Sequence, residues 1–136
     1  MISFNYETDF NLNSETQISS WITETITEEG YTLEEINYIF CDDDYLHKLN
    51  VEFLDHDTLT DIISFDYTMG KRIAGDIYIS VERVEDNAKD FNVNFTEELH
   101  RVIIHGVLHY CGYKDKTEAD AAIMREKENY YIAKIA

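Results

Sequence analysis

Residues 96–116 read TEELHRVIIHGVLHYCGYKDK, a stretch that combines a strongly apolar helical pattern with a distinctive set of polar residues. Little polar surface is left between Val102 and Leu108, which predicts a buried central helix from Thr96 to Cys111. Its first residues, Thr-Glu-Glu-Leu, resemble a capping box that begins at Thr96. Because a buried helix needs partners on several sides, we expect the rest of the chain to pack around it.

Short strands and helices alternate along the chain outward from this helix. Runs of β-branched and aromatic residues predict strands at ISFNYE (2–7), EEINYIFC (34–41), DIISFDY (61–67) and RIAGDIYIS (72–80). The turn-like TMGK between the last two predicts an antiparallel hairpin. Helical spacing predicts helices over residues 14–30, 42–54, 81–91, 96–111 and 117–132. This order, βαβαββααα, predicts one α+β domain over residues 1–136, a small mixed sheet of about four strands packed with about five helices.

Some residues of the other helices have a plain structural interpretation. Trp21 lies on an apolar helical stripe, so we expect a core residue rather than a platform for stacked bases. Aspartates 42–44 lack the alternating spacing and the glycine of a calcium loop, which favours capping of the helix that follows. The last helix has four residues roughly in line, Ala122, Ile123, Glu126 and Tyr130.

A three-residue metal site is predicted at the end of the central helix. His105 and His109 are four residues apart, so their imidazoles lie on one helix face about one turn apart and both can bind a single ion. Gly112 suits the left-handed conformation that ends a helix and turns the chain back, which brings Asp115 toward the same ion. Three protein ligands leave a fourth position for water, as in catalytic zinc sites. We therefore expect one zinc ion per chain.

Two other interpretations fit part of this pattern. An HxxxH pair alone also suits two hydrogen-bonded core histidines, and it is the addition of Gly112 and Asp115 that favours a metal site. The spacing is also close to the zincin pattern H-E-x-x-H-x-x-G-x-x-H, but Gly106 stands in place of the glutamate. That glutamate is the general base of such metalloproteases, so the sequence argues against peptide hydrolysis while it keeps the ion site.

Three segments together carry a family resemblance: HGVLHYCGYKD (105–115), LNVEFLDHDTLTDIISFDY (49–67) and AGDIYIS (74–80). They resemble the H-G-x-L-H-L-x-G-Y-D-H signature, the N-x-x-[FY]-R-x-x-D-x-x-T-[DN]-V-L-S-F region and the L-G-D-[IL]-x-I-[SC] strand of the YbeY-type endoribonucleases. The motifs occur in the family's order and cover most of residues 46–115. The resemblance implies a metal-dependent endoribonuclease of rRNA maturation, acting on single-stranded RNA near the 3′ end of small-subunit rRNA.

Three positions in two of the motifs depart from the family pattern. Asp115 stands where the family has its third histidine, with Lys114 in place of the preceding aspartate, so the ligand set would be His, His, Asp. A carboxylate ligand adds negative charge, which should make bound water less acidic than under three imidazoles. Leu54 stands where the family usually has an arginine associated with activity. Lys71, Arg72 or Lys114 would then supply the cation that meets a substrate phosphate.

The net charge of −17, from 11 basic and 28 acidic side chains, opposes binding to RNA, because nucleic-acid affinity rests on lysine and arginine contacts with phosphate. The acidic residues are concentrated in residues 1–70, whereas the half that carries the metal motif is nearly neutral. Salt screens charges beyond about 8–10 Å, so basic residues of this second half can still meet a phosphate backbone. Scattered solubility charges are the other interpretation.

No run of eighteen apolar residues occurs, and MISFNYETDF has neither a basic n-region nor a long apolar core. We therefore expect neither membrane insertion nor export by a recognisable signal, and a cytoplasmic location. In that compartment Cys41 and Cys111 are expected to be reduced, buried thiols. Cys111 should point away from the ligand face of the helix.

The general base is left unassigned by the sequence. Asp61, Asp66 and Glu98 are candidates, and each suits a capping or surface role equally well. His56 lies in the region that matches the family's arginine motif, although its pattern also fits an exposed loop histidine. His100 is expected to face another side of the central helix.

Two functions of different classes remain open. The first is an endoribonuclease that acts on rRNA or the ribosomal small subunit through His105, His109 and Asp115. The second is a non-catalytic ribosome-biogenesis factor that binds ribosomal or assembly proteins, with a metal that mainly holds the last loop on the helix. Leu54, Asp115 and the acidic half favour the second, because an acidic surface suits a basic protein partner.

Overall fold

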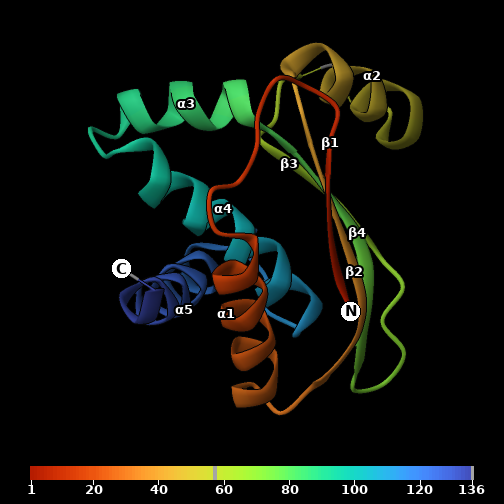
Figure 1. The fold of residues 1–136 in the computed structure, drawn as a ribbon, viewed down its shortest axis with the longest axis vertical. Coiled ribbons are helices and arrows are strands. Elements are labelled where there is room, and N and C mark those ends of the chain that lie inside the picture. The colour runs from red at the N-terminus through yellow and green to blue at the C-terminus, as the bar shows by residue number, and fades with distance from the viewer. Residues whose placement is uncertain (57, 136) are drawn as a thin grey trace.

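The computed structural model describes residues 1–56 and 58–135, and the strands in this part of the chain form one four-stranded sheet, ordered β1-β2-β4-β3 (Figure 1). They are β1 (Ile2–Tyr6), β2 (Thr32–Cys41), β3 (Ile62–Asp66) and β4 (Arg72–Ser80). Strand β2 runs parallel to both β1 and β4, whereas β3 runs antiparallel to β4. The predicted mixed sheet and its antiparallel hairpin are confirmed.

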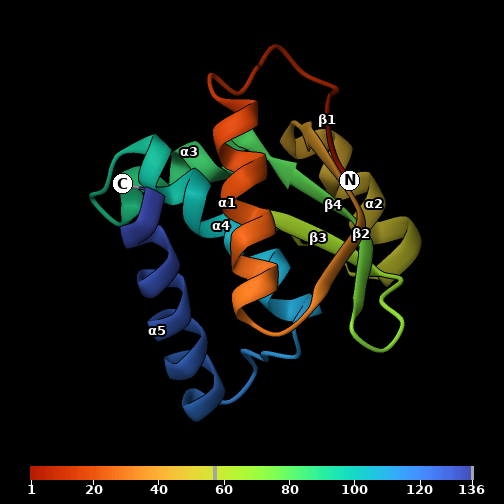
Figure 2. The same ribbon diagram turned by 60° about the horizontal axis from the view of Figure 1, so that its bottom comes forward.

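The helices of the described residues are α1 (Glu15–Glu28), α2 (Asp43–Leu54), α3 (Val81–Asp90), α4 (Phe95–Tyr110) and α5 (Glu118–Ile135). Helices α1 and α4 cover one face of the sheet and α2 lies on the other, while α5 packs against α4 (Figures 1 and 2). The predicted order of elements and the α+β class are therefore confirmed, with α4 as the central helix.

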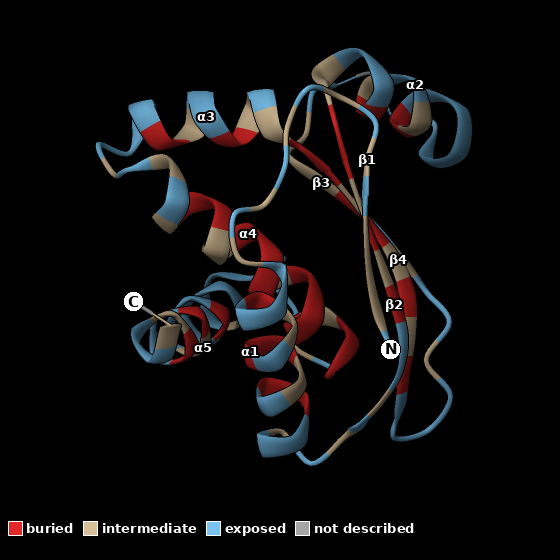
Figure 3. Cartoon of the chain, viewed as in Figure 1, coloured by how far each residue is buried: buried red, intermediate tan, exposed pale blue. Residues whose placement is uncertain are grey.

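The main core lies between α1, α4 and the inner face of the sheet, where the buried segments in Figure 3 meet. Side chains alternate between the two faces of a strand, so every second residue of β2 and β4 points inward. The fully buried ones are Ile36, Tyr38, Phe40, Ile73, Ile77 and Ile79. They pack with the α4 residues Ile103, Ile104, Val107 and Leu108, which are also fully buried. Burial of each such side chain contributes about 1.5–3 kcal/mol, which holds α4 against the sheet.

Gly106 allows α4 to approach the sheet closely. A Cβ atom at this position would lie 2.9 Å from Cδ1 of Ile77 and 3.2 Å from Cδ1 of Ile62. Contacts this short require the neighbouring atoms to move, because protein interiors are packed to nearly crystalline density. Gly106 therefore has a packing role, and this explains a glycine where zincins have their glutamate.

A second close approach fixes the C-terminal turn of α4. The Tyr110 hydroxyl lies 3.0 Å from the carbonyl oxygen of Phe65 and 3.1 Å from that of Asp76, and it donates its proton between them. Gly75 makes room for this hydroxyl, because a Cβ atom there would overlap both Tyr110 and the Phe65 carbonyl. The ring of Tyr110 thus anchors the end of α4, next to His109, to the hairpin.

The central helix begins one residue before the predicted Thr96, and its N-cap lies two residues before the predicted one. Asn94, not Thr96, is the N-cap, and its side-chain oxygen accepts a hydrogen bond from the Glu97 N–H at 2.8 Å. Phe95 is the first helical residue and packs edge-on against Phe10, with ring centroids 6.0 Å apart. Asn94 stands three residues before Glu97, so the sequence carries a second local capping pattern, and this is the one that the helix uses.

The inward face of α5 consists of Met124, Glu128 and Tyr131, spaced i, i+4 and i+7. The four aligned residues noted in the sequence lie on the outside, where Ile123 and Tyr130 are about half exposed. The difference matters for the site, because it turns a glutamate toward α4.

The predictions for Trp21 and Asp42 are confirmed. Trp21 is buried in the core, where its indole N–H donates to the Tyr131 carbonyl at 2.8 Å. Asp42 caps α2 by accepting a hydrogen bond from the Tyr45 N–H at 2.9 Å. Among residues 1–56 and 58–135, none of the helices combines the length and the apolar character needed to cross a membrane.

Candidate metal centre

His105, His109 and Asp115 come together at the C-terminal end of α4. The two Nε2 atoms of the histidines are 3.0 Å apart, and Oδ2 of Asp115 lies 3.1 Å from Nε2 of His105 and 3.4 Å from Nε2 of His109. Among the described residues, these three side chains form a group that could hold a metal ion. The juxtaposition that the sequence predicted for these residues is therefore present in the fold.

The spacing of these donor atoms fits a small tetrahedral ion. Ligand atoms at about 2.0–2.1 Å from a tetrahedral zinc are separated from each other by about 3.3–3.4 Å. The observed separations of 3.0, 3.1 and 3.4 Å need only slight expansion to reach this value. Two imidazole nitrogens and one carboxylate oxygen also form a donor set that first-row divalent ions accept.

A Schellman motif places the third ligand. Gly112 has a φ of +97°, its N–H donates to the His109 carbonyl at 3.0 Å, and the Tyr113 N–H donates to the Leu108 carbonyl at 3.1 Å. This left-handed residue ends α4 and reverses the chain, as the glycine predicted. The loop that follows leads to α5 at one end of the molecule (Figure 2) and carries Asp115 back to the two histidines.

The same loop is tied to α1 and α5. The Tyr113 hydroxyl donates to Oε1 of Glu29 at 2.7 Å, and the carboxylate of Glu29 also accepts hydrogen bonds from Lys127 and from the Tyr131 hydroxyl. These bonds hold Tyr113 two residues before Asp115. Three helices thus contribute to the position of the third ligand.

Glu128 is a residue of the site that the sequence did not indicate. It projects from α5, and its Oε2 lies 2.6 Å from Nδ1 of His105, while Oε1 lies 3.1 Å from Nη1 of Arg101. Its side chain is only 5% exposed. The i, i+4, i+7 pattern with Met124 and Tyr131 was the signal in the sequence that could have placed it on the inward face.

Two opposing effects act on the pKa of His105. Burial lowers it, but the hydrogen bond and charge of Glu128, together with the charges of Asp115 and Asp61, raise the pKa of His105 above its usual value. A metal ion must compete with this proton, since only a neutral imidazole binds a metal.

The three basic residues predicted to contact substrate have different surroundings. Lys114 is exposed in the ligand loop, next to Asp115. Lys71 lies over the ring of Tyr31, with Nζ 4.1 Å from its centroid. Arg72, the first residue of β4, is paired with Glu34, and its Nη2 lies 2.7 Å from Oε1 of that residue.

A cavity of about 220 Å³ lies beside His105 and brings together two of the carboxylates considered as bases. It is lined by Asp61 and Glu98, together with Arg101, Arg125 and Glu128. Burial raises the pKa of both Asp61 and Glu98 above their usual values. The third candidate, Asp66, accepts a hydrogen bond from the Thr68 N–H in the hairpin turn instead.

The remaining residues singled out in the sequence lie outside the ligand group. Leu54 is the last residue of α2 and is 42% exposed, and His56 is exposed in the loop that follows. His100 packs against the ring of Trp21, on another side of α4 as expected. Cys111 is a buried free thiol, and burial raises its pKa to about 12.

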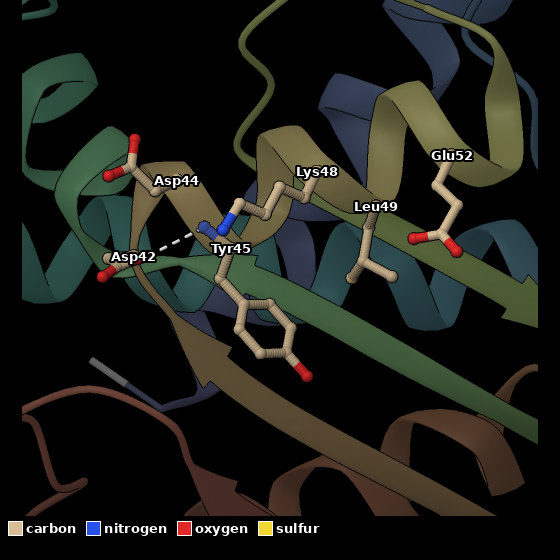
Figure 4. Close-up of a pocket in the computed structure, with 6 residues that line it drawn as sticks. All are labelled: Asp42, Asp44, Tyr45, Lys48, Leu49 and Glu52. Carbon is tan, nitrogen blue, oxygen red and sulfur yellow. Dashed lines mark hydrogen bonds between the residues drawn. The ribbon is translucent and has the colours of Figure 1, made fainter.

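A separate groove runs along α2 on the opposite face of the sheet (Figure 4). Its lining residues are Asp42, Asp44, Tyr45, Lys48, Leu49 and Glu52. Three carboxylates and one ammonium group give this groove an acidic character, and none of the three ligand residues lines it.

Fold and site together define an α+β domain that carries a three-residue metal-binding group at the end of its central helix. Residues 2–136 match the family model described as Endoribonuclease YbeY. The chain therefore belongs to the YbeY family of endoribonucleases.

Similar proteins agree over nearly the full length. The chain is 66% identical over 133 residues to Endoribonuclease YbeY of Flavobacterium johnsoniae, which covers 98% of this chain and 96% of the relative. It is 61% identical over 129 residues to the protein of the same name from Flavobacterium psychrophilum, covering 95% of this chain and 92% of the relative. A solution structure of a Thermotoga maritima protein matches with a TM-score of 0.73 at 30% identity, over 99% of this chain and 89% of that one.

Proposed function

We propose that this chain is a zinc-dependent endoribonuclease that hydrolyses phosphodiester bonds in single-stranded RNA. His105, His109 and Asp115 would hold one zinc ion as its catalytic centre. The observation that carries the proposal is the convergence of their three donor atoms within 4.8 Å of one another at an accessible helix end. The side chains of His109 and Asp115 are 32% and 39% exposed, which leaves an approach for a phosphodiester.

The chemistry divides between the ion and the protein. A zinc ion bound here would supply a Lewis acid for the phosphate and lower the pKa of water. The protein contributes preorganisation: α4 fixes the two imidazoles one turn apart, and the Schellman motif fixes the carboxylate opposite them. For the cation that meets a substrate phosphate we propose Lys114 first, because it is exposed beside Asp115. Arg72 is compensated by Glu34 and is the weakest of the three candidates.

We further propose rRNA maturation in the cytoplasm as the setting, with cleavage near the 3′ end of small-subunit rRNA. Support comes from the three sequence motifs shared with the family and from the endoribonuclease names of the relatives. The near-neutral second half of the chain, which carries the ligands, supports RNA binding at this end rather than along α2.

A second candidate is a ribosome-biogenesis factor that binds ribosomal or assembly proteins and uses its metal mainly as a structural element. The acidic groove along α2 (Figure 4) favours it, because Asp42, Asp44 and Glu52 complement a lysine- or arginine-rich protein surface. The exposed Leu54 also favours this second candidate, because its side chain cannot bind phosphate.

Cleavage of a precursor RNA that contains the small-subunit 3′ end separates the two candidates. The purified chain should cleave it with zinc and stop when a chelator is added, and His105→Ala and His109→Ala should be inactive. His47→Ala, on α2 across the sheet, is the matched histidine control and should retain cleavage. Cleavage that persists in the ligand variants contradicts the catalytic proposal. A chain that never cleaves but loses thermal stability on chelation supports the second candidate.

A further inference from the structure

The two nitrogens of the His105 ring face different surroundings. Nε2 lies among the donor atoms of His109 and Asp115, at 3.0 and 3.1 Å. Nδ1 faces α5, where Oε2 of Glu128 lies at 2.6 Å. A neutral imidazole carries a proton on only one nitrogen, and the partner of that proton decides which nitrogen keeps its lone pair.

Glu128 is a buried hydrogen-bond acceptor that Arg101 holds in place. Its side chain is 5% exposed, and Nη1 of Arg101 lies 3.1 Å from its other oxygen, Oε1. Arg101 is itself largely buried, at 16% exposure, and stands one helical turn before His105 on the same face of α4. With Oε1 accepting from Arg101, the carboxylate presents Oε2 to Nδ1 as an acceptor, so we assign the proton between them to the histidine.

From this geometry we propose that Glu128 is the positioning residue of the metal centre. It holds the proton of His105 on Nδ1, turns the Nε2 lone pair toward Asp115 and His109, and raises the basicity of that nitrogen. Arg101 holds the Glu128 side chain in place. The proposal rests on the metal-binding role proposed above for His105, and it assigns to α5 a direct part in the affinity for metal.

A purely structural role makes a different prediction. Glu128 joins α5 to α4 through Arg101 and His105, so it also contributes to the packing of the two helices. If packing were its only role, its replacement would lower the free energy of unfolding but leave the metal affinity of the folded protein unchanged. Affinity measured where every variant is folded therefore separates the two roles.

The experiment is a zinc titration of the full chain in competition with a chelator of known affinity, for wild type, Glu128→Gln and Arg101→Met. Glu128→Gln keeps the size of the side chain but removes its charge, and we expect about 10- to 100-fold weaker zinc binding. Arg101→Met should weaken binding in the same direction by a smaller factor. Glu126→Gln, an exposed glutamate two residues away on α5, is the matched control and should bind zinc like wild type.

A spectroscopic measurement tests the proton itself. In the zinc-loaded wild type, the Nδ1–H of His105 should give a downfield proton resonance protected from exchange with water, and Glu128→Gln should lose that protection. If Glu128→Gln does not fold, Glu128→Asp replaces it. The shorter aspartate side chain should no longer reach Nδ1 of His105, and its zinc affinity and proton protection are compared with wild type in the same way.

Unchanged zinc affinity and unchanged protection in the folded variant would overturn the proposal. Because no RNA is present, the result is independent of cleavage. A wild type that binds zinc in this Glu128-dependent way but never cleaves RNA would contradict the proposed enzymatic function and leave the role of Glu128 standing.

Discussion

Replacement of Gly106 tests the close approach of α4 to the sheet. In Gly106→Ala, the new Cβ would lie 2.9 Å from Cδ1 of Ile77 and 3.2 Å from Cδ1 of Ile62. Overpacking of this kind costs about 1–3 kcal/mol. Alanine has the higher helix propensity, and its replacement of glycine within a helix stabilises the protein by about 1 kcal/mol. The net expectation is a loss of stability between about 0 and 2 kcal/mol.

Gly106→Glu, which restores the zincin residue, should be far more damaging. It adds to the same steric overlap a carboxylate in a fully packed interior with no cationic partner, which costs about 3–5 kcal/mol. The free energy of unfolding of a domain is about 5–15 kcal/mol in total, so the variant should be strongly destabilised or unfolded.

Urea unfolding followed by circular dichroism, with chelator present, measures both variants against wild type. Asn129→Ala, at an exposed position of α5, is the control for helix propensity and should be stabilised by up to about 0.7 kcal/mol. If the free energy of unfolding of Gly106→Ala rises by the full value of about 1 kcal/mol expected from helix propensity, the new methyl group meets no steric overlap with the sheet. That result would refute the packing argument. A Gly106→Glu variant as stable as wild type would refute it as well.

Three further predictions address the ligand loop, the hairpin and the pH dependence. Asp115→Ala should retain less zinc than wild type by elemental analysis after dialysis, and an equal content would reject this residue as a ligand. Gly75→Ala should lose about 3 kcal/mol or more in urea unfolding, because its Cβ would meet both the Tyr110 ring and the backbone carbonyl of Phe65; a loss below about 1 kcal/mol would contradict the geometry. Burial holds the pKa of His100 below its usual value, so its contribution to stability is present above about pH 6.5 and is lost as the pH falls; His100→Gln should flatten the decline in unfolding free energy between about pH 7.5 and pH 5.5, and an unaltered slope would count against it.

The parts of the site that follow from local rules could be predicted from the sequence. The i, i+4 spacing of His105 and His109 determines a shared helix face, and Gly112 determines where the helix ends and turns. These relations act within about ten residues of each other, where backbone geometry leaves few alternatives. The order of strands and helices followed from the same kind of periodicity.

The parts that depend on distant contacts could not be predicted in the same way. Glu128 reaches His105 from 23 positions away, and only the packing of α5 on α4 brings them together. The pairing of Arg72 likewise depends on Glu34 in a neighbouring strand. Such contacts leave at most a weak periodic signal in the sequence, because the partner is chosen by the tertiary fold.

The same dependence on α5 determines how the role of the metal can be tested. An ion held by His105, His109 and Asp115 would link α4 to the loop that begins α5, and Glu128 links α5 back to His105. Metal binding is then coupled to the docking of α5, and removal of the ion should lower thermal stability whether the ion is catalytic or structural. Loss of stability on chelation is therefore common to both proposed functions. Cleavage by folded, zinc-loaded protein is the measurement on which they differ.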